Sequence, residues 1–187
     1  MKVNGNTIKP GNVIEHKNGL WVAVKTSHVK PGKGDAFAQI ELRNSKDGTT
    51  LNERFRSSEN IERVILEEVP HVFLYKENNT LVFMNNNTFD QINIDENMIG
   101  EQASYLQDGM MVMINIYNEE PVSVNMPDSC VLEVVETEAV IKGQTVSSSF
   151  KPAILNNNVK VMVPGHIEVG SKIVVRPSDS SYIEKAK

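Results

Sequence analysis

The sequence predicts an all-β protein of three small barrels in tandem. Short runs of alternating apolar residues recur along all 187 residues, and Gly, Pro and Asn residues separate them. Only residues 94–106 have the composition of a short helix, and Gly100 interrupts them. No apolar run approaches 18 residues, so we expect no membrane-spanning segment.

The first unit, residues 1–64, begins with two strong hairpin signals, the pairs Asn4-Gly5 and Asn18-Gly19. A strand-like run at 20–24 and an alternating run at 36–42 follow, and residues 61–64 close the unit. Short strands joined by tight turns over this length predict a small antiparallel barrel.

The two runs at 20–24 and 36–42 flank a turn of sequence PGKGD, with Lys33 at its centre. Gly and Pro suit a tight turn, so we predict a long hairpin with Lys33 at or near the tip. The glycines on both sides leave Lys33 room to approach another surface closely. One interpretation is a solvated charge, and the other is a contact with phosphate or RNA. Schiff-base chemistry is disfavoured because no apolar pocket surrounds the amine.

Two further units of similar length follow, residues 65–127 and 128–187. In the first of them, runs at 72–75 and 80–84 predict a hairpin, and residues 110–116 predict a buried strand rich in Met. In the second, residues 131–137 predict a strand, 142–149 a polar loop and 159–164 another strand. Five-stranded barrels would fit both units, although the similarity between their sequences is weak.

Charge is distributed unevenly among the three units. Residues 1–64 hold 11 Lys or Arg and 7 Asp or Glu, whereas residues 65–127 hold 1 and 10, and residues 128–187 hold 7 of each. A basic first unit beside an acidic second one suggests that the first unit meets a polyanion. Six residues could form a basic face around the hairpin, or could be ordinary scattered surface charge: Lys25, Lys30, Arg43, Lys46, Arg54 and Arg56.

Motifs for catalysis, metal binding or cofactor binding are not found. The four histidines are far apart and lack ligand spacing, and the one cysteine, Cys130, cannot complete a zinc site. No phosphate-cradling glycine motif and no G-x-S-x-G context is present. We therefore expect no catalytic residues, no metal, no cofactor and no enzyme activity. A single cysteine also excludes an internal disulfide and fits a reducing, cytoplasmic location.

Three stretches resemble the bacterial elongation factor P family, and the resemblance extends over the whole chain. Residues 29–37, VKPGKGDAF, are similar to the hairpin loop of the family, and residues 83–91 to its middle domain. Residues 151–170 are similar to its C-terminal signature, with Asn158 where the family has Gly. Residues 117–121 depart from the usual Trp-Asn-Gly turn of the family.

This resemblance implies an SH3/KOW-like barrel followed by two OB-fold barrels, together an L-shaped mimic of tRNA. In that family the protein enters the 70S ribosome between the peptidyl and exit sites. The lysine at the position of Lys33 is commonly extended by a lysyl-tRNA-synthetase-like enzyme. It then reaches the CCA end of the peptidyl-site tRNA and relieves stalling at consecutive prolines.

The resemblance also implies roles for individual residues. Pro31, Gly32 and Gly34 would shape the tip, and the six basic residues of the first unit would contact tRNA and rRNA backbones. The loop near the exit-site codon would correspond to Gly143, Gln144 and Thr145, although only Gly143 matches the Gly-Asp-x-Ala-Gly pattern of the family. We expect a monomer that binds no membrane. The alternative is a barrel-repeat RNA-binding adaptor unrelated to peptide-bond formation.

Overall fold

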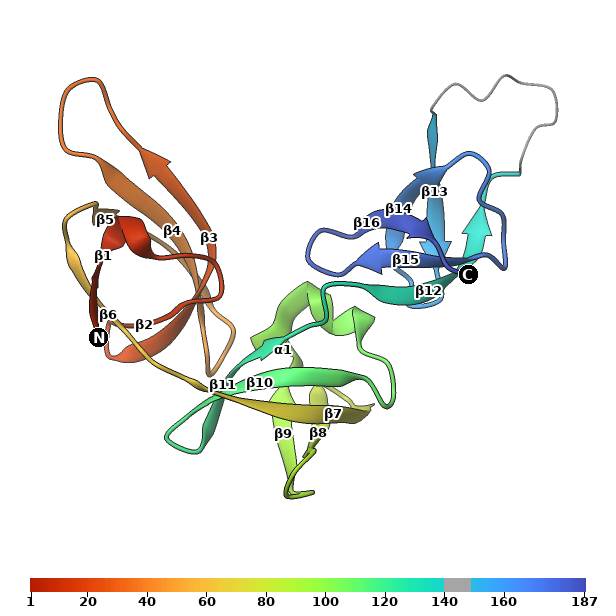
Figure 1. Cartoon of the computed structure of the whole chain (residues 1–187), viewed down its shortest axis with the longest axis horizontal. Coiled ribbons are helices and arrows are strands. Elements are labelled where there is room, and N and C mark those ends of the chain that lie inside the picture. Colours follow the sequence, from red (N-terminus) through yellow and green to blue (C-terminus); the bar gives the residue numbers. More distant parts are fainter. Residues whose placement is uncertain (140–148) are drawn as a thin grey trace. The chain divides into compact units, whose positions relative to one another are not determined.

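The computed structural model describes residues 1–139 and 149–187, and within them strands predominate (Figure 1). The chain forms two compact units. The first comprises Met1–Gly100 with Asp108–Asn125, and the second comprises Glu101–Gln107 with Met126–Lys187. The first unit contains two sheets and the second contains one, so the chain has three sheet units as predicted.

The first sheet has six strands in the order β1-β6-β2-β3-β4-β5. Its inner face is apolar because alternate residues of β3, β4 and β5 point inward, which the burial pattern of β4 shows most clearly. Ile14, Trp21, Ile40, Leu42 and Phe55 are the larger members of this core. The elements are β1 (Lys2–Asn4), η1 (Gly5–Thr7), β2 (Val13–His16), β3 (Gly19–Val29), β4 (Phe37–Asn44), β5 (Thr50–Arg56) and β6 (Asn60–Arg63).

One of the two Asn-Gly predictions is confirmed and the other is wrong. His16 pairs with Gly19, and the two central turn residues Lys17 and Asn18 have φ of 46° and 59°, as a type I′ hairpin requires. Gly5 instead begins η1, a 3₁₀ helix of one turn. A Cβ there would lie 2.8 Å from the carbonyl oxygen of Arg56, so this glycine serves a close approach of two backbones and no hairpin.

The second sheet has five strands in the order β11-β10-β7-β8-β9. Its core includes Phe73 and Phe83, whose ring centroids lie 5.4 Å apart. The helix prediction for residues 94–106 is partly confirmed, because Gly100 at φ 77° separates a short α-helix from a 3₁₀ helix. The elements are β7 (Glu67–Glu77), β8 (Thr80–Asn85), β9 (Gln91–Asp95), α1 (Glu96–Ile99), η2 (Gly100–Tyr105), β10 (Met111–Tyr117) and β11 (Glu120–Asn125).

The third sheet has five strands in the order β14-β13-β12-β15-β16, and β14 also contacts β16, which closes the sheet. Its core is aliphatic, with Leu155, Val163, Ile167, Ile173 and Val175 fully buried. The elements are β12 (Cys130–Thr137), β13 (Phe150–Leu155), β14 (Lys160–Pro164), β15 (Lys172–Arg176) and β16 (Ser181–Lys185).

The second and third sheets share one topology. In each, the first strand pairs with the second and the fourth, the third strand pairs with the second, and the fifth pairs with the fourth. This is the strand order of a five-stranded OB-type barrel. The shared topology was not visible in the weakly similar sequences, because a barrel core accepts any apolar residue of suitable volume at each inward position.

Candidate functional site: the Lys33 arm

The candidate site is the outer part of the β3–β4 hairpin, residues 25–41, which we call the arm. A β-bulge between Ala23 and Lys25 marks its beginning on β3. Trp21 and Ala23 before the bulge are buried, whereas the residues from Ser27 to Val29 are exposed. A bulge bends a strand and increases its twist, so β3 changes direction where its residues change from buried to exposed.

Three strands support the base of the arm. The β3–β4 pairing continues to Val29 and Phe37, and β5 pairs with β4 as far as Arg56 opposite Phe37. The Ser57 backbone N–H also donates to the Ala36 carbonyl at 2.9 Å. Only the tip loop, residues 30–36, therefore extends beyond the sheet (Figure 1).

The tip loop leaves Lys33 free to move its side chain. All residues from Lys30 to Asp35 are exposed. A Cβ at Gly32 would have no neighbour within 4 Å, and one at Gly34 would meet only Pro31, at 3.8 Å. Gly34 has φ 119°, a backbone conformation that favours glycine. Among the residues that the structure describes, none forms an ion pair with Lys33.

Three of the six predicted basic residues lie at the tip, Lys30 in the loop itself and Arg54 and Arg56 on the neighbouring strand β5. Arg54 on β5 stacks over the Phe37 ring, with its guanidinium carbon 3.3 Å from the ring centroid. Arg56 lies directly opposite Phe37 in the strand pairing. Together with Lys30 and Lys33, they place four cationic side chains at the outer end of the hairpin, where a phosphate backbone would find a concentrated positive charge.

The other three predicted basic residues lie elsewhere. Lys25 is on the arm and forms a long ion pair of 3.9 Å with Glu41, with its side chain 80% exposed. Arg43 is the penultimate residue of β4, at the opposite end of the hairpin, and Lys46 lies in the turn between β4 and β5. The six residues are therefore spread along the hairpin from its tip to its inner end, which the sequence alone did not predict.

Arg43 has a contact that the sequence did not predict. Its guanidinium Nη1 donates to the Ile99 carbonyl of α1, 56 residues away, at 2.7 Å. The side chain is half-buried there, so part of its hydrogen-bonding capacity is used within the protein. No sequence signal distinguishes this arginine from a surface arginine, because its partner is a backbone carbonyl that any residue would supply.

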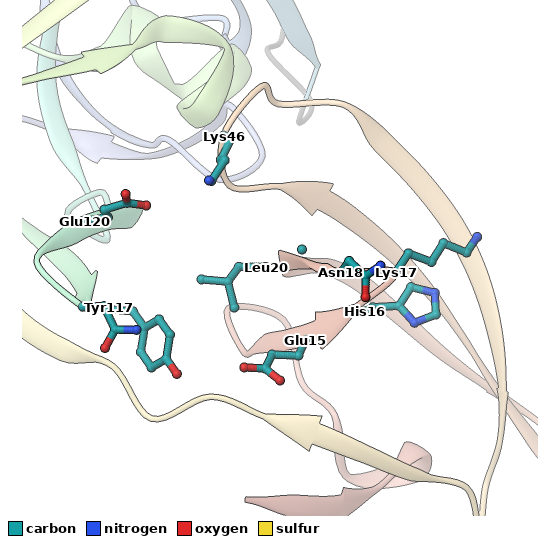
Figure 2. Close-up of a pocket in the computed structure, with 10 residues that line it drawn as sticks. Glu15, His16, Lys17, Asn18, Leu20, Lys46, Tyr117 and Glu120 are labelled. Atoms are coloured by element: carbon teal, nitrogen blue, oxygen red, sulfur yellow. The ribbon is translucent and has the colours of Figure 1, made fainter.

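A pocket of about 560 Å³ lies in the first unit, between the turns of the first and second sheets. Figure 2 shows Glu15, Leu20, Tyr117 and Glu120 around this space, whereas His16 and Lys17 point away from it. Lys46, one of the six predicted basic residues, also lines this pocket, so its side chain lies among residues of both sheets and away from the tip loop.

A small charged network links the β2–β3 turn to β5. The Lys17 ammonium and the His16 Nε2, the latter at 3.4 Å, both face the same Glu53 oxygen. The hydrogen bond from Lys17, followed by the neighbouring His16, lowers the pKa of the Glu53 carboxyl below its ordinary value. The His16 ring also meets Phe55 edge-on, with centroids 5.3 Å apart. This network joins the β2–β3 turn to β5 and does not involve the tip loop.

In the described ranges, 1–139 and 149–187, no group of three or more His, Cys, Asp or Glu side chains is arranged to hold a metal ion. Within the same ranges, no helix is both long and apolar enough to cross a membrane. Burial of Cys130 raises the pKa of its thiol, which suits a small core residue better than a reactive one.

Family models match almost the entire chain in three consecutive segments. Residues 4–61 match the elongation factor P KOW-like domain, residues 66–124 the elongation factor P OB domain, and residues 130–185 the elongation factor P C-terminal domain. The chain belongs to the elongation factor P family. The first sheet is thus the KOW-like domain of this translation factor family, and the second is its OB domain.

Full-length relatives agree with this assignment. The chain is 52% identical to elongation factor P from Parvibaculum lavamentivorans and 50% identical to that from a Chelativorans strain, in each case over 186 residues and all of both chains. A solved translation initiation factor 5A from Methanococcus jannaschii is 21% identical, with a TM-score of 0.46, over 66% of this chain and 88% of that chain.

The positions at which this chain departs from the family pattern keep their turn geometry where the structure describes them. Asn158 has φ 64°, so it takes over the left-handed conformation of the family glycine, as predicted. Asn118 and Glu119 have φ of 50° and 65°, and the β10–β11 hairpin turn is retained. Gly143, Gln144 and Thr145, predicted near the exit-site codon, lie outside the described residues.

Proposed function

We propose that this elongation factor P family member binds the 70S ribosome between the peptidyl and exit sites and stimulates peptide-bond formation at consecutive prolines. The observation that carries the proposal is the tip loop, where Lys33 stands exposed between two glycines whose surroundings are empty. In this proposal a lysyl-tRNA-synthetase-like enzyme extends Lys33, and the extended side chain contacts the CCA end of the peptidyl-site tRNA.

The mechanism is one of orientation. Lys33 carries a flexible cationic chain, and Pro31, Gly32 and Gly34 keep other side chains away from it. Holding the tRNA end in a near-attack geometry lowers the entropic cost of reaction without any protein group that reacts. The ribosome remains the catalyst, and the protein itself is no enzyme in this proposal.

Five of the six predicted basic residues would bind nucleic-acid phosphates. Lys30, Arg54 and Arg56 lie beside the tip, Lys25 lies along the arm, and Lys46 lies at its far end. Such contacts position the protein and carry no base sequence information. In the same proposal, residues 65–127 and 128–187 form the second and third domains, loop residues 143–145 face the exit-site codon, and the protein acts as a cytoplasmic monomer.

The test is reconstituted translation of a reporter with three consecutive prolines, with protein purified from its native source. We expect full-length product to rise with the native protein and not with Lys33→Ala, whereas Lys9→Ala, which removes an exposed charge far from the tip loop, should remain active. Lys33→Arg keeps the charge but not the primary amine, so it should also fail if extension of that amine is required.

Ribosome pelleting of the same variants separates binding from stimulation. Lys33→Ala should still pellet with ribosomes, because most phosphate contacts remain. If folded native protein leaves the stalling unchanged, the proposal is wrong. An RNA-binding adaptor would then be favoured, and Lys33→Ala would weaken RNA binding by about one charge.

A further inference from the structure

The inner end of the same hairpin is attached to the OB domain by Arg43. The Arg43 guanidinium donates to the Ile99 carbonyl at 2.7 Å, and Ile99 is the last residue of α1. It also lies over the backbone of Gly100, where a Cβ would be 2.9 Å from Nη1. Gly100 has φ 77°, so any other residue at this position would be strained and would push the guanidinium away.

A second contact joins the same two segments. Gly48, in the turn after β4, has φ 72°, and a Cβ there would lie 2.3 Å from the Asn97 carbonyl oxygen of α1. The two backbones are therefore so close that only glycine fits. The helix is itself held in place by Asp95, whose carboxylate accepts from the Asn97 N–H at 2.8 Å. We call the contacts of Arg43 and Gly48 with α1 the latch.

A third attachment joins the two sheets of the first unit beside the latch. Val13, Val64 and Val122 are buried together, with Val22 and Tyr117 among the residues packed against them. Val22 is paired with Arg43 across β3 and β4, so the latch adjoins this apolar patch. The latch extends the attachment from the patch to α1, and it therefore opposes rotation of the KOW-like domain about the patch.

Strand β4 connects the latch to the tip loop that carries Lys33. Strand β4 runs from Phe37 beside the tip loop to Asn44 beside the latch. Arg43 is six residues from Phe37 along this extended strand, roughly 20 Å at about 3.3 Å per residue, and the tip loop lies beyond Phe37. A tilt of about 5° at the latch would therefore move the base of the tip loop by roughly 2 Å, whereas misplacement by ~1 Å can cost about a hundredfold in rate.

We propose that Arg43 is a positioning residue: it locks the KOW-like domain to α1 of the OB domain and so fixes the direction in which the Lys33 arm points. The positioning role of Arg43 rests on the proposed function, whereas the existence of the latch does not. This assignment differs from the expectation that Arg43 contacts RNA, because its guanidinium is directed to a backbone carbonyl within the protein. Lysine would replace it only in part, since an ammonium could donate to the Ile99 carbonyl but lacks the planar group that lies against Gly100.

The first experiment measures the latch without any ribosome. Spin labels are attached at Asn52 on β5 and Asn93 on β9, both exposed, in a Cys130→Ala background, and the distance distribution between them is recorded. We expect one narrow distribution for native Arg43, a broader one for Arg43→Ala and an intermediate one for Arg43→Lys. Lys9→Ala, which removes a charge away from the latch, should change nothing. An unchanged distribution in Arg43→Ala would overturn the latch.

Gly100→Ala attacks the same contact from the OB domain and leaves Arg43 in place. It should broaden the distribution as Arg43→Ala does, and thermal melts recorded by circular dichroism confirm that each variant is folded. Should Arg43→Ala not fold, Arg43→Lys and Gly100→Ala together decide the question, because one keeps the charge and the other keeps the arginine.

The second experiment separates positioning from RNA binding in proline-reporter translation. With Arg43→Ala we expect the half-saturating protein concentration to change less than about threefold, and the maximal rate to fall roughly ten- to hundredfold. Arg43→Lys, which keeps the charge, should also lose rate. Rescue by Arg43→Lys together with a raised half-saturating concentration in Arg43→Ala would identify an RNA contact and overturn the positioning role.

The two experiments test different claims, so either claim can be overturned without the other. If the native protein does not stimulate peptide-bond formation at consecutive prolines, the proposed function is wrong. The spin-label distances still decide whether the latch exists. If the distances broaden in Arg43→Ala and the maximal rate stays unchanged, the latch exists but does not aim the arm, and the positioning role is overturned.

Discussion

The two ends of the β3–β4 hairpin are built by opposite means. At the outer end, a Cβ added at Gly32 would meet nothing within 4 Å, and Lys33 is exposed. At the inner end, Leu42 is fully buried, and a Cβ added at Gly48 would lie 2.3 Å from a backbone oxygen. Glycine therefore serves two different needs in neighbouring turns of one sheet: open space around the β3–β4 tip, and close packing of two backbones at the β4–β5 turn.

The largest effect we predict comes from core truncation at the inner end. Leu42→Ala should lower the free energy of unfolding by about 2–5 kcal/mol, because it leaves a cavity in a fully buried site. Val29→Ala, near the tip and 37% exposed, should cost less than about 1 kcal/mol. Urea unfolding followed by the fluorescence of Trp21, the one tryptophan, reports on this barrel. Equal losses for the two variants would contradict the contrast between the ends.

The second prediction compares two glycines. Gly48→Ala introduces a Cβ against the Asn97 backbone at φ 72°, so we expect a loss of about 1–3 kcal/mol or more. Gly32→Ala meets no neighbour and should stay within about 0.5 kcal/mol of the native protein. The measurement is again urea unfolding. A neutral Gly48→Ala would mean that the turn and α1 separate easily.

A smaller effect is expected beside the tip loop. Arg54 stacks on Phe37 at 3.3 Å, and the two residues are diagonal neighbours on adjacent strands. A double-mutant cycle with Arg54→Gln and Phe37→Leu should give a coupling energy of about 0.5–1 kcal/mol. Purely additive effects of the two changes on unfolding would show that the stacking contributes nothing to the arm.

The sequence predicted the outer end of the hairpin far better than the inner end. The PGKGD turn and the alternation of residues 36–42 are local patterns, and the backbone conformation of such a turn depends mainly on its own residues. The exposure of Lys33 and the left-handed conformation of Asn158 were predictable for the same reason. Local chemistry is readable wherever the neighbours in space are also neighbours in sequence.

The latch could not be predicted, since Arg43 and Ile99 are 56 residues apart and the acceptor is a backbone carbonyl. Gly100 was interpreted only as an interruption of a helix, and no prediction was made for Gly48. Their positive φ and close contacts become apparent only when two sheets are placed together. The wrong hairpin prediction at Asn4-Gly5 has the same cause, because Gly5 is required by the approach of Arg56.

The smallest effect we predict is a pH dependence in the barrel behind the arm. The hydrogen bond from Lys17 lowers the pKa of Glu53, so the folded state favours the ionised carboxylate. This stabilisation is complete above the ordinary glutamate pKa of 4.5 and is lost as the pH falls through the lower folded pKa. Acidification from pH about 6 to about 3 should therefore lower the free energy of unfolding more in the native protein than in Glu53→Gln. The difference between the two losses should be less than about 1 kcal/mol.

The control for this last prediction is salt. The difference between native protein and Glu53→Gln should shrink in about 1 M NaCl, because ions screen a pair in which the Lys17 side chain is 56% exposed. Lys17→Met should reproduce the altered pH dependence, since it removes the main cause of the lowered pKa. If both variants keep the native pH dependence, the Glu53 network contributes nothing to stability.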